Sequence, residues 1–309
     1  MKGLVLLTSY PKSGNTWFRA VLTSVWSNGQ EVDINKLRVM NCADRSHFDR
    51  ILGISSSDLT NLEISTLRPR VHETALRACS GDIFYKVHDA WLPTFPERKY
   101  EYPFPRPLIK RVVYIVRDPR DVAVSLANHM GQSINAIISL MNSPAFNFAA
   151  GMRTVRTQMP QLMSRWTDHF ESWVDRGEFD VHLVKYEDML ANPHEEFRKA
   201  FDYLGISVTD RVLSSAIGAT RFEKLKNQEV EGGFFERPPR SKVFFRKGVA
   251  GGWSECLTGE QANQIVTDHG RLMRRLGYLA DHTDVEKSTM EEGLSDLLGR
   301  EYQPSPRPS

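Results

Sequence analysis

The sequence predicts an α/β fold with a central, mostly parallel sheet flanked by helices. Short runs with a strand-like pattern lie at residues 3–7, 82–88, 111–116 and 181–185. Segments with apolar residues at helical spacing alternate with these runs, and such alternation is typical of right-handed βαβ units. The length of 309 residues allows one large α/β domain or two small ones.

The first predicted strand, residues 3–7, reads GLVLL, a continuous apolar run of the kind found in buried parallel strands. A polar loop containing Gly14 follows, and apolar residues at helical spacing from Phe18 to Val25 then predict a helix. Free N–H groups and the helix dipole meet at such a corner, which suits a phosphate. Lys12 adds a positive charge. The alternative is an ordinary strand–turn–helix corner with a solvated lysine.

The pattern between the first two strands is weak. Residues 33–35 predict the cap of a short helix, whereas polar residues at 55–58 and a proline in 67–69 predict loops. Arg68, Arg70 and His72 form a small basic cluster, which we expect on a solvated face. After the strand at 82–88, residues 91–106 are rich in proline and aromatic residues, which predicts a long binding loop or lid.

The clearest strand, residues 111–116, leads into a helix with Asp118 as N-cap and Pro119 at its first position. Residues 128–151 are mixed and predict helix and loop material at the mouth of the fold. Apolar residues then repeat at helical spacing and predict a helix packed on the core; they are Leu162, Trp166, Phe170 and Trp173.

The last third of the chain begins with the strand at 181–185. Capping boxes are expected at Asn192–Glu195 and at Thr258 with Gln261, a further helix at 210–217, and a loop at 229–246. We expect one domain over residues 1–280 and a polar, poorly ordered tail over 281–309.

Composition excludes several classes of function. The 40 basic and 38 acidic residues leave a net charge of +2, which argues against an extended nucleic-acid surface. The three cysteines are far apart and lack metal-ligand spacing, which predicts reduced thiols in a cytoplasm. The N-terminus does not resemble a signal peptide, and no segment approaches the roughly 20 apolar residues that span a bilayer. We therefore expect a cytoplasmic protein without a metal or a membrane span.

Polar side chains follow the predicted strands at one edge of the sheet. The loop at Lys12, His88, Arg117 and Tyr186 all lie beyond carboxyl ends, where parallel sheets bind ligands. A nucleotide-binding Walker loop needs Gly-Lys-Ser/Thr and a metal-binding aspartate, but here Lys12 precedes Gly14 and the clearest strand ends in Arg117. The edge therefore predicts a phosphate site built from cations and amides without a metal.

A second flexible basic stretch, residues 246–253, reads RKGVAGGW. Its glycines allow the backbone to approach a ligand closely, and arginine can bind a phosphate through two hydrogen bonds. One phosphate at the first loop and another at Arg117, Ser125 and Arg246 would suit a nucleotide with two separate phosphate positions.

Five segments in this order resemble the signatures of sulfotransferases that use 3′-phosphoadenosine 5′-phosphosulfate (PAPS): TSYPKSGNTW, YKVH, VVYIVRDPRDVAVS, KYEDM and FRKGVAGGW. The resemblance covers residues 3 to about 278, nearly the whole sequence, and it implies a P-loop-like sulfotransferase fold. The resemblance assigns the 5′-phosphosulfate to Lys12, Ser13, Gly14, Asn15 and Thr16. It assigns the 3′-phosphate to Arg117, Ser125, Arg246, Lys247 and Gly248. It assigns the adenine to Trp17, Tyr186, Thr220 and Phe222.

The resemblance also implies a mechanism: an acceptor hydroxyl attacks sulfur in line, and 3′-phosphoadenosine 5′-phosphate (PAP) leaves. His88 matches the general base, and an ordinary histidine pKa near 6.5 suits that role. Lys12 would neutralise the bridging oxygen while Ser13 holds it aside until the acceptor binds, and Lys86 would assist at the sulfuryl oxygens. The acceptor class stays open among small molecules, phenols, carbohydrates and glycopeptides.

Two departures and two alternatives accompany this interpretation. Asn15 stands where many animal enzymes have threonine. Residues 253–257 lack the lysine of the dimer motif of those enzymes, which argues against that dimer interface, although a homodimer stays possible. The segment 130–161 has no counterpart and, with residues 93–106, is expected to shape the acceptor site. The alternatives are a P-loop kinase or NTPase, and a non-catalytic protein that only binds a nucleotide.

Overall fold

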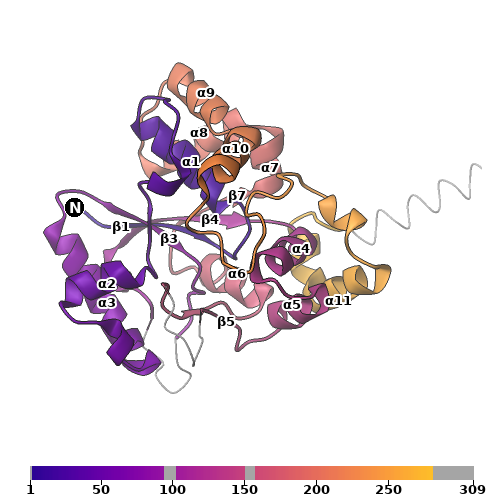
Figure 1. Ribbon diagram of the computed structural model, residues 1–309, viewed down its shortest axis with the longest axis horizontal. Coiled ribbons are helices and arrows are strands. Elements are labelled where there is room, and N and C mark those ends of the chain that lie inside the picture. Colours follow the sequence, from indigo (N-terminus) through magenta and orange to yellow (C-terminus); the bar gives the residue numbers. More distant parts are fainter. Residues whose placement is uncertain (1, 94–101, 150–156, 281–309) are drawn as a thin grey trace, which may run out of the picture.

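The computed structural model describes residues 2–93, 102–149 and 157–280 and has an α/β fold around a five-stranded sheet (Figure 1). The strand order is β2-β3-β1-β4-β7, and each of these pairings is parallel. The strands are β1 Leu4–Ser9, β2 Met40–Asn41, β3 Ile83–Val87, β4 Ile109–Val116 and β7 Val181–Lys185. The predicted parallel sheet is confirmed, and the short edge strand β2 was not predicted. A small antiparallel pair joins β5 (Asn147–Phe148) to β6 (Gln161–Leu162).

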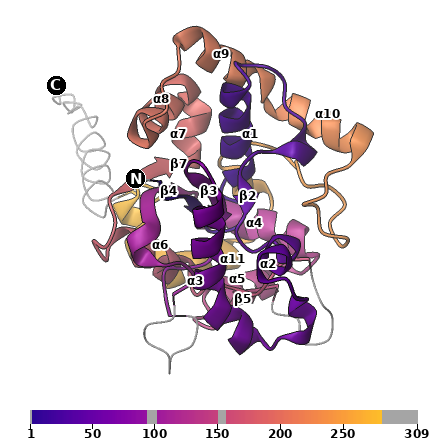
Figure 2. The same ribbon diagram turned by 90° about the vertical axis from the view of Figure 1, so that its left-hand side faces the viewer.

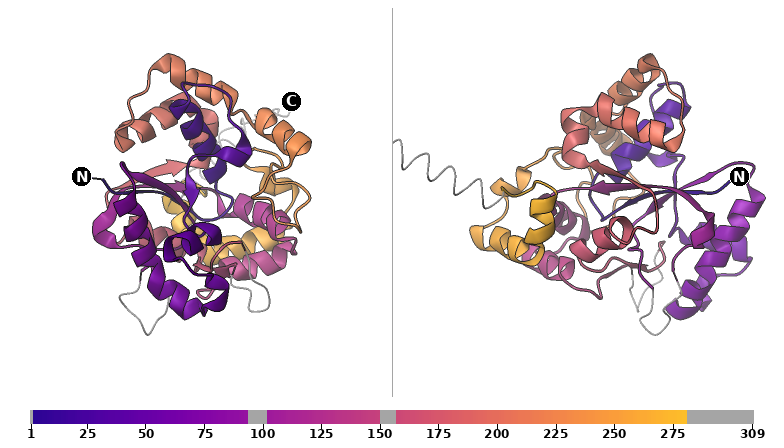
Figure 3. Two further views of the ribbon diagram at one scale, coloured as in Figure 1. Left: turned by 60° about the vertical axis from the view of Figure 1, so that its left-hand side comes forward. Right: turned by 180° about the vertical axis from the view of Figure 1, so that it is seen from behind.

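Helices cover both faces of the sheet, and Figures 2 and 3 show the two layers from other directions. One layer contains α1 Asn15–Trp26, α7 Tyr186–Ala191, α8 Pro193–Leu204 and α9 Asp210–Ala219. The other contains α2 Arg45–Leu52, α3 Asn61–Ala78, α4 Pro119–Met130, α5 Ile134–Met141, α6 Trp166–Val174 and α11 Gly259–Arg275. The helix α10 Phe222–Gly232 and the 3₁₀ turns η1 Ile34–Lys36, η2 Ser56–Asp58, η3 Arg106–Leu108 and η4 Gly252–Glu255 complete the described elements.

The side chains of β4 alternate between two hydrophobic cores. Val112 and Tyr114 pack in the core beneath α4 and α6, whereas Val113 and Ile115 pack in the core beneath α1 and α8. Because each face of the sheet is covered, all six positions of β1 and the last five of β4 are buried. This explains why the strands read as continuous apolar runs rather than alternating ones.

Most of the predicted helix starts are confirmed. The Asp118 carboxylate accepts a hydrogen bond from the N–H of Arg120 at 2.9 Å, and Pro119 is the first residue of α4. Thr258 and Gln261 form the reciprocal bonds of a capping box at α11. Asn192 precedes α8, but its side chain makes no capping bond, so the capping box predicted there is wrong.

The loop predicted at 67–69 is wrong, because these residues lie inside α3. A capping box between Thr60 and Glu63 starts this helix, and Pro69 is accommodated in its interior. The solvated basic face is wrong for Arg68 and His72, which are each 1% exposed. The Arg68 guanidinium instead binds the carboxylate of Asp89 at 2.7 and 2.8 Å.

Three further boundaries differ from the prediction. Leu162 belongs to β6, so the core helix begins at Trp166. Residues 229–232 belong to α10, which was not predicted, and the loop begins at 233. Parts of the predicted segments 91–106 and 130–161, and the whole tail 281–309, lie outside the described residues. Within the described residues, no helix is long and apolar enough to cross a membrane.

Candidate active site

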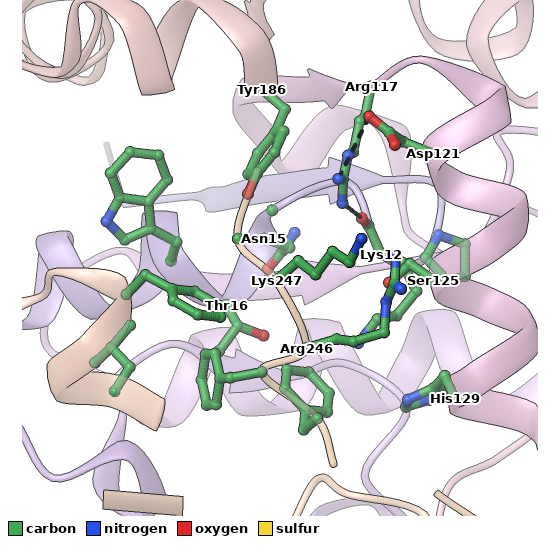
Figure 4. Close-up of a pocket in the computed structure, with 18 of the residues that line it drawn as sticks. Lys12, Asn15, Thr16, Arg117, Asp121, Ser125, His129, Tyr186, Arg246 and Lys247 are labelled. Carbon is green, nitrogen blue, oxygen red and sulfur yellow. Dashed lines mark hydrogen bonds and ion pairs between the residues drawn. The ribbon is translucent and has the colours of Figure 1, made fainter. Parts of the chain in front are cut away.

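A cavity of about 400 Å³ lies at the carboxyl ends of β1, β3 and β4 (Figure 4), and its volume falls within the range of ligand sites. All but two of the predicted site residues line it: Lys12, Gly14, Asn15, Thr16, Trp17, Lys86, His88, Arg117, Ser125, Tyr186, Phe222, Arg246, Lys247 and Gly248. Ser13 and Thr220 do not line it. The buried Thr220 hydroxyl donates to the carbonyl of Ala216 at 2.8 Å.

The loop between β1 and α1 begins the site. Gly14 has a φ of 102°, and a Cβ there would lie 2.5 Å from the Tyr186 ring, so only glycine fits. Helix α1 has no side-chain cap and no acidic residue in its first turn. The N–H groups of that turn and the helix dipole therefore favour an anion at this end of the cavity.

The Asn15 side chain holds this loop in place. Its Nδ2 donates to the carbonyl of Leu7 at 2.8 Å and to the Ser9 hydroxyl at 3.3 Å, both on β1. The side-chain N–H donors therefore bind the protein, which leaves the backbone N–H of Asn15 for a ligand. The nearby Ser13 side chain is buried, and its hydroxyl has no hydrogen-bond partner among the described residues.

Lys12 is half-buried and has the left-handed φ of 71°, an uncommon conformation for lysine. Its ammonium lies 3.5 Å from the centre of the Phe244 ring, as a cation–π contact. Burial, together with the nearby charges of Lys86 and Arg117, lowers the pKa of Lys12 to about 7. An anion bound at this loop would restore the charge of Lys12.

His88 follows β3, and its Nδ1 lies 2.8 Å from the carbonyl oxygen of Ser9. A carbonyl only accepts hydrogen bonds, so Nδ1 carries the proton and Nε2 has the free lone pair. Burial and the neighbouring Lys86 hold the pKa of His88 well below its usual value. The ring is therefore neutral at pH 7, the form that a general base requires.

Hydrogen bonds from α6 fix the backbone that follows β3. The ring of His169 donates from Nε2 to the carbonyl of His88 at 3.0 Å and accepts at Nδ1 from the Tyr114 hydroxyl at 2.8 Å. The indole N–H of Trp173 donates to the carbonyl of Asp89 at 2.9 Å. These contacts hold the backbone that presents His88.

Lys86 lies two residues before His88, and its ammonium donates to the Glu236 carboxylate at 2.9 Å. Glu236 also accepts a hydrogen bond from Arg19 at 2.8 Å. Glu236 was not predicted, because it lies in the loop after α10, outside every motif. Only the fold brings it to Lys86.

The other end of the cavity joins β4, α4 and the loop after residue 245. Arg117 donates to the carbonyls of Lys12 at 3.2 Å and Val249 at 2.8 Å, and lies over the Tyr186 ring. Asp121 accepts from the backbone N–H groups of Gly251 at 2.8 Å and Trp253 at 2.9 Å. Asp121 therefore holds the basic loop against α4. The sequence analysis missed it, although it lies one helical turn after Arg117.

Gly248 makes the closest approach of this loop to the rest of the site. It has a φ of 66°, and a Cβ there would lie 2.2 Å from the Phe222 ring. Phe222 begins α10, and Trp17 packs edge-to-face on Tyr186 at a centroid distance of 6.3 Å. These aromatic side chains give the cavity flat apolar walls, which suit a nucleotide base.

Several residues that were not predicted also line the cavity. They include His129, Phe148, Gln158 and Phe244. His129 lies four residues after Ser125 on α4, so helical spacing could have identified it. Burial lowers the pKa of His129 to about 2, and its Nδ1 has no hydrogen-bond partner in the described part of the chain. The ring is therefore a neutral polar group in a mostly aromatic wall.

No group of three or more His, Cys, Asp or Glu side chains that could hold a metal occurs among the described residues. The cavity instead combines backbone N–H groups with the cations of Lys12, Lys86, Arg117, Arg246 and Lys247. Such a set binds phosphate-like anions without a metal bridge.

Comparison with known proteins agrees with this geometry. The family model described as "Sulfotransferase domain" matches residues 2–277. The chain is 25% identical over 283 residues to Sulfotransferase 1A1 of Canis lupus familiaris, covering 88% of this chain and 84% of that protein. It is 25% identical over 279 residues to Cytosolic sulfotransferase 16 of Arabidopsis thaliana, covering 84% and 73%.

Two solved structures share the fold. A mouse sulfotransferase, SULT7A1, complexed with PAP gives a TM-score of 0.56 at 19% identity, covering 93% of this chain and 89% of that one. A retinol dehydratase in a complex with retinol and PAP gives a TM-score of 0.58 at 20% identity, covering 88% and 82%.

Proposed function

Because this chain belongs to the sulfotransferase domain family, we propose that it transfers the sulfuryl group of PAPS to an acceptor hydroxyl. The observation that carries the proposal is the cavity itself. It gathers the uncapped N-terminus of α1 and Lys12 together with Arg117 and the loop of residues 246–248 around one space. Phosphate-binding donors from two parts of the fold, with aromatic walls beside them, suit a nucleotide with phosphates at two positions.

The residues fit PAPS in chemistry as well as charge. The first turn of α1 supplies N–H groups for a 5′-phosphosulfate, and Arg117, Ser125 and Arg246 supply donors for a 3′-phosphate. Gly14 and Gly248 are positions where a side chain would collide with Tyr186 or Phe222, so both backbones approach the cavity closely. PAP, the nucleotide that PAPS leaves after sulfuryl transfer, is bound in a mouse sulfotransferase and in a retinol dehydratase that share this fold.

The donor supplies an activated sulfuryl group: the acceptor oxygen forms a bond to sulfur, and the bond from sulfur to the phosphate oxygen breaks. In our proposal Nε2 of His88 takes the proton of the acceptor hydroxyl, since Nδ1 is bound to the Ser9 carbonyl. Lys12 neutralises the charge that grows on the leaving phosphate oxygen, and Lys86 binds the sulfuryl oxygens.

A P-loop kinase or NTPase is the competing function. It requires Gly-Lys-Ser/Thr in the first loop and a metal-binding carboxylate after a strand. Here Lys12 precedes Gly14, and β4 is followed by Arg117. A non-catalytic nucleotide-binding protein is the other alternative, and the combination of Lys12, Lys86 and a neutral His88 in one cavity favours catalysis over it.

We also propose that the protein acts in the cytoplasm on a small-molecule or glycan hydroxyl. The name of the Arabidopsis relative supports the compartment, and the free thiols of Cys42, Cys79 and Cys256 agree with a reducing one. The aromatic wall formed by Phe148 and Phe244, whose rings both contact His129, supports an acceptor with an apolar body.

The function is tested by incubating the protein with PAPS labelled in its sulfuryl group and an extract of its host, then identifying the labelled product. The matched variant H88Q retains a side chain of similar polarity, and we expect its rate to fall about 10²–10⁴-fold with PAP binding unchanged. Turnover without loss in H88Q would exclude His88 as the base. Equal thermal stabilisation by ATP and by PAP would contradict the assignment of the donor.

A further inference from the structure

Glu236, which lies outside every sequence motif named above, is at the centre of a buried cluster of three charged side chains. Its Oε1 accepts from the Arg19 guanidinium at 2.8 Å, and its Oε2 accepts from the Lys86 ammonium at 2.9 Å. The three side chains are 6%, 2% and 8% exposed, respectively. They come from three elements: the loop after α10, helix α1 and strand β3.

The two cations that bind Glu236 differ in their position relative to the cavity. Lys86 and Glu236 line it, whereas Arg19 does not and lies behind the carboxylate. A guanidinium cannot be buried cheaply without an anionic partner. Arg19 therefore anchors one oxygen of Glu236 from behind, and the other oxygen holds the ammonium of Lys86 at the cavity wall.

The charge of Lys86 depends on this partner. Burial lowers the pKa of Lys86, the Glu236 carboxylate opposes that effect, and the charge of Arg19 adds to the lowering. Burial would raise the pKa of Glu236, but Arg19 and Lys86 outweigh it and hold the carboxyl ionised. Without Glu236, two buried cations would face each other, and the lysine is the one that can lose its proton.

We infer that Glu236 is the positioning residue for Lys86: it fixes the ammonium at one place on the cavity wall and keeps it protonated, with Arg19 as its anchor. This inference rests on the proposed sulfuryl transfer, in which Lys86 serves the sulfuryl oxygens. An uncharged lysine would lose that electrostatic contribution, so Glu236 would act on the reaction without touching either substrate.

Other titratable groups act on Lys86 from the elements around it. The thiol of Cys42 is neutral because burial raises its pKa, and His88 and His129 are neutral because burial lowers theirs. Lys12 lies close to Lys86, whose charge helps to lower the pKa of Lys12 to about 7. Lys12 is therefore neutral in alkaline solution. Above about pH 7, Arg19 and Glu236 are therefore the charged groups that act most strongly on the pKa of Lys86.

The test measures the protonation of Lys86 in the ligand-free protein, by NMR titration of lysine Hε–Cε signals assigned with K86R. We expect E236Q to lower the pKa of Lys86 by about 1–3 units. We expect R19M to raise it, because a neighbouring positive charge is removed. An electrostatic role predicts changes of opposite sign in the pKa of Lys86 for E236Q and R19M. General loosening of the structure would change this pKa in the same direction in both variants. An unchanged pKa in E236Q, or a fall in R19M, would overturn the inference, and R19M tests it even where E236Q fails to fold.

Activity provides a second readout. In E236Q the alkaline limb of kcat, measured with PAPS saturating so that Lys12 stays charged, should move to lower pH. The control is N35A: the Asn35 amide binds Gly233 and Phe235 of the same loop, so its loss loosens the loop without changing its charge. A matching shift in N35A would overturn the inference. A wild-type protein that does not use PAPS would refute the proposed function, whereas the NMR titration would still decide the role of Glu236.

Discussion

The affinity for PAP should fall as the pH rises through 7, because Lys12 loses its proton in the ligand-free protein. Burial and the charges of Lys86 and Arg117 lower its pKa to about 7. A bound phosphate would stabilise the ammonium, so the pKa of Lys12 rises in the complex and binding takes up a proton. The protonated protein is the form that binds, and affinity is therefore lost on the alkaline side.

The magnitude follows from the fraction of protonated Lys12. With a pKa of about 7, roughly half of the molecules carry the charge at pH 7, and roughly one in a hundred does at pH 9. If Lys12 remains charged in the complex, the dissociation constant rises about 50-fold over this range, which is about 2.3 kcal/mol. Phosphate groups, whose second pKa is about 6, are already ionised there and add little.

Isothermal titration calorimetry of PAP in buffers of different ionisation enthalpy measures both the affinity and the proton uptake. The matched control is K12R, because a guanidinium stays charged at every pH used. Its affinity should stay nearly constant, and any slope that remains reports Lys86. Equal affinities of the wild type at the two ends of the range, or the same slope in K12R, would refute the reasoning.

Three other substitutions give separable results. Gly248→Ala would place a Cβ 2.2 Å from an aromatic ring and should weaken PAP binding about tenfold. Gly251→Ala is its control, with the same left-handed φ but open space, and an equal loss there would contradict the argument. Ser125→Ala should weaken PAP about fivefold but leave AMP, which lacks a 3′-phosphate, unchanged; losses for both would speak against its role. Arg68→Leu leaves the buried carboxylate of Asp89 unpaired and should cost about 3–5 kcal/mol of unfolding free energy in urea, and a loss under about 1 kcal/mol would show that the pair matters little.

The sheet could be predicted from the sequence because its strands are buried on both faces. The central strands read as apolar runs, and all four predicted strands lead into residues that line the cavity, namely Lys12, His88, Arg117 and Tyr186. The edge strand Met40–Asn41 could not be predicted because two residues carry no pattern. A loop was predicted at residues 67–69 because proline usually ends a helix, but Pro69 lies inside α3. The capping box at Thr60 that starts this helix was visible in the sequence.

The site was predictable where its residues lie in contiguous segments. Lys12, His88, Arg117 and Gly248 each belong to a motif that follows a strand or a glycine turn. Glu236 could not be identified in this way, because its role depends on contacts with residues 217 and 150 positions away. Such a pairing is specified by the fold and leaves no local signal in one sequence.

The residues that we assign to the two phosphates are held largely by different parts of the fold, and a hydrogen bond from Arg117 to the Lys12 carbonyl at 3.2 Å links them. Arg117 and Asp121 bind the backbone of residues 249–253, so the end with Ser125 is one unit built on β4 and α4. The end with Lys12 is instead formed by the first loop, β3 and Glu236. Changes at Ser125 should therefore alter nucleotide affinity with little effect on the chemical step. Changes at Glu236 should alter the pH dependence of the chemical step more than the affinity for PAP.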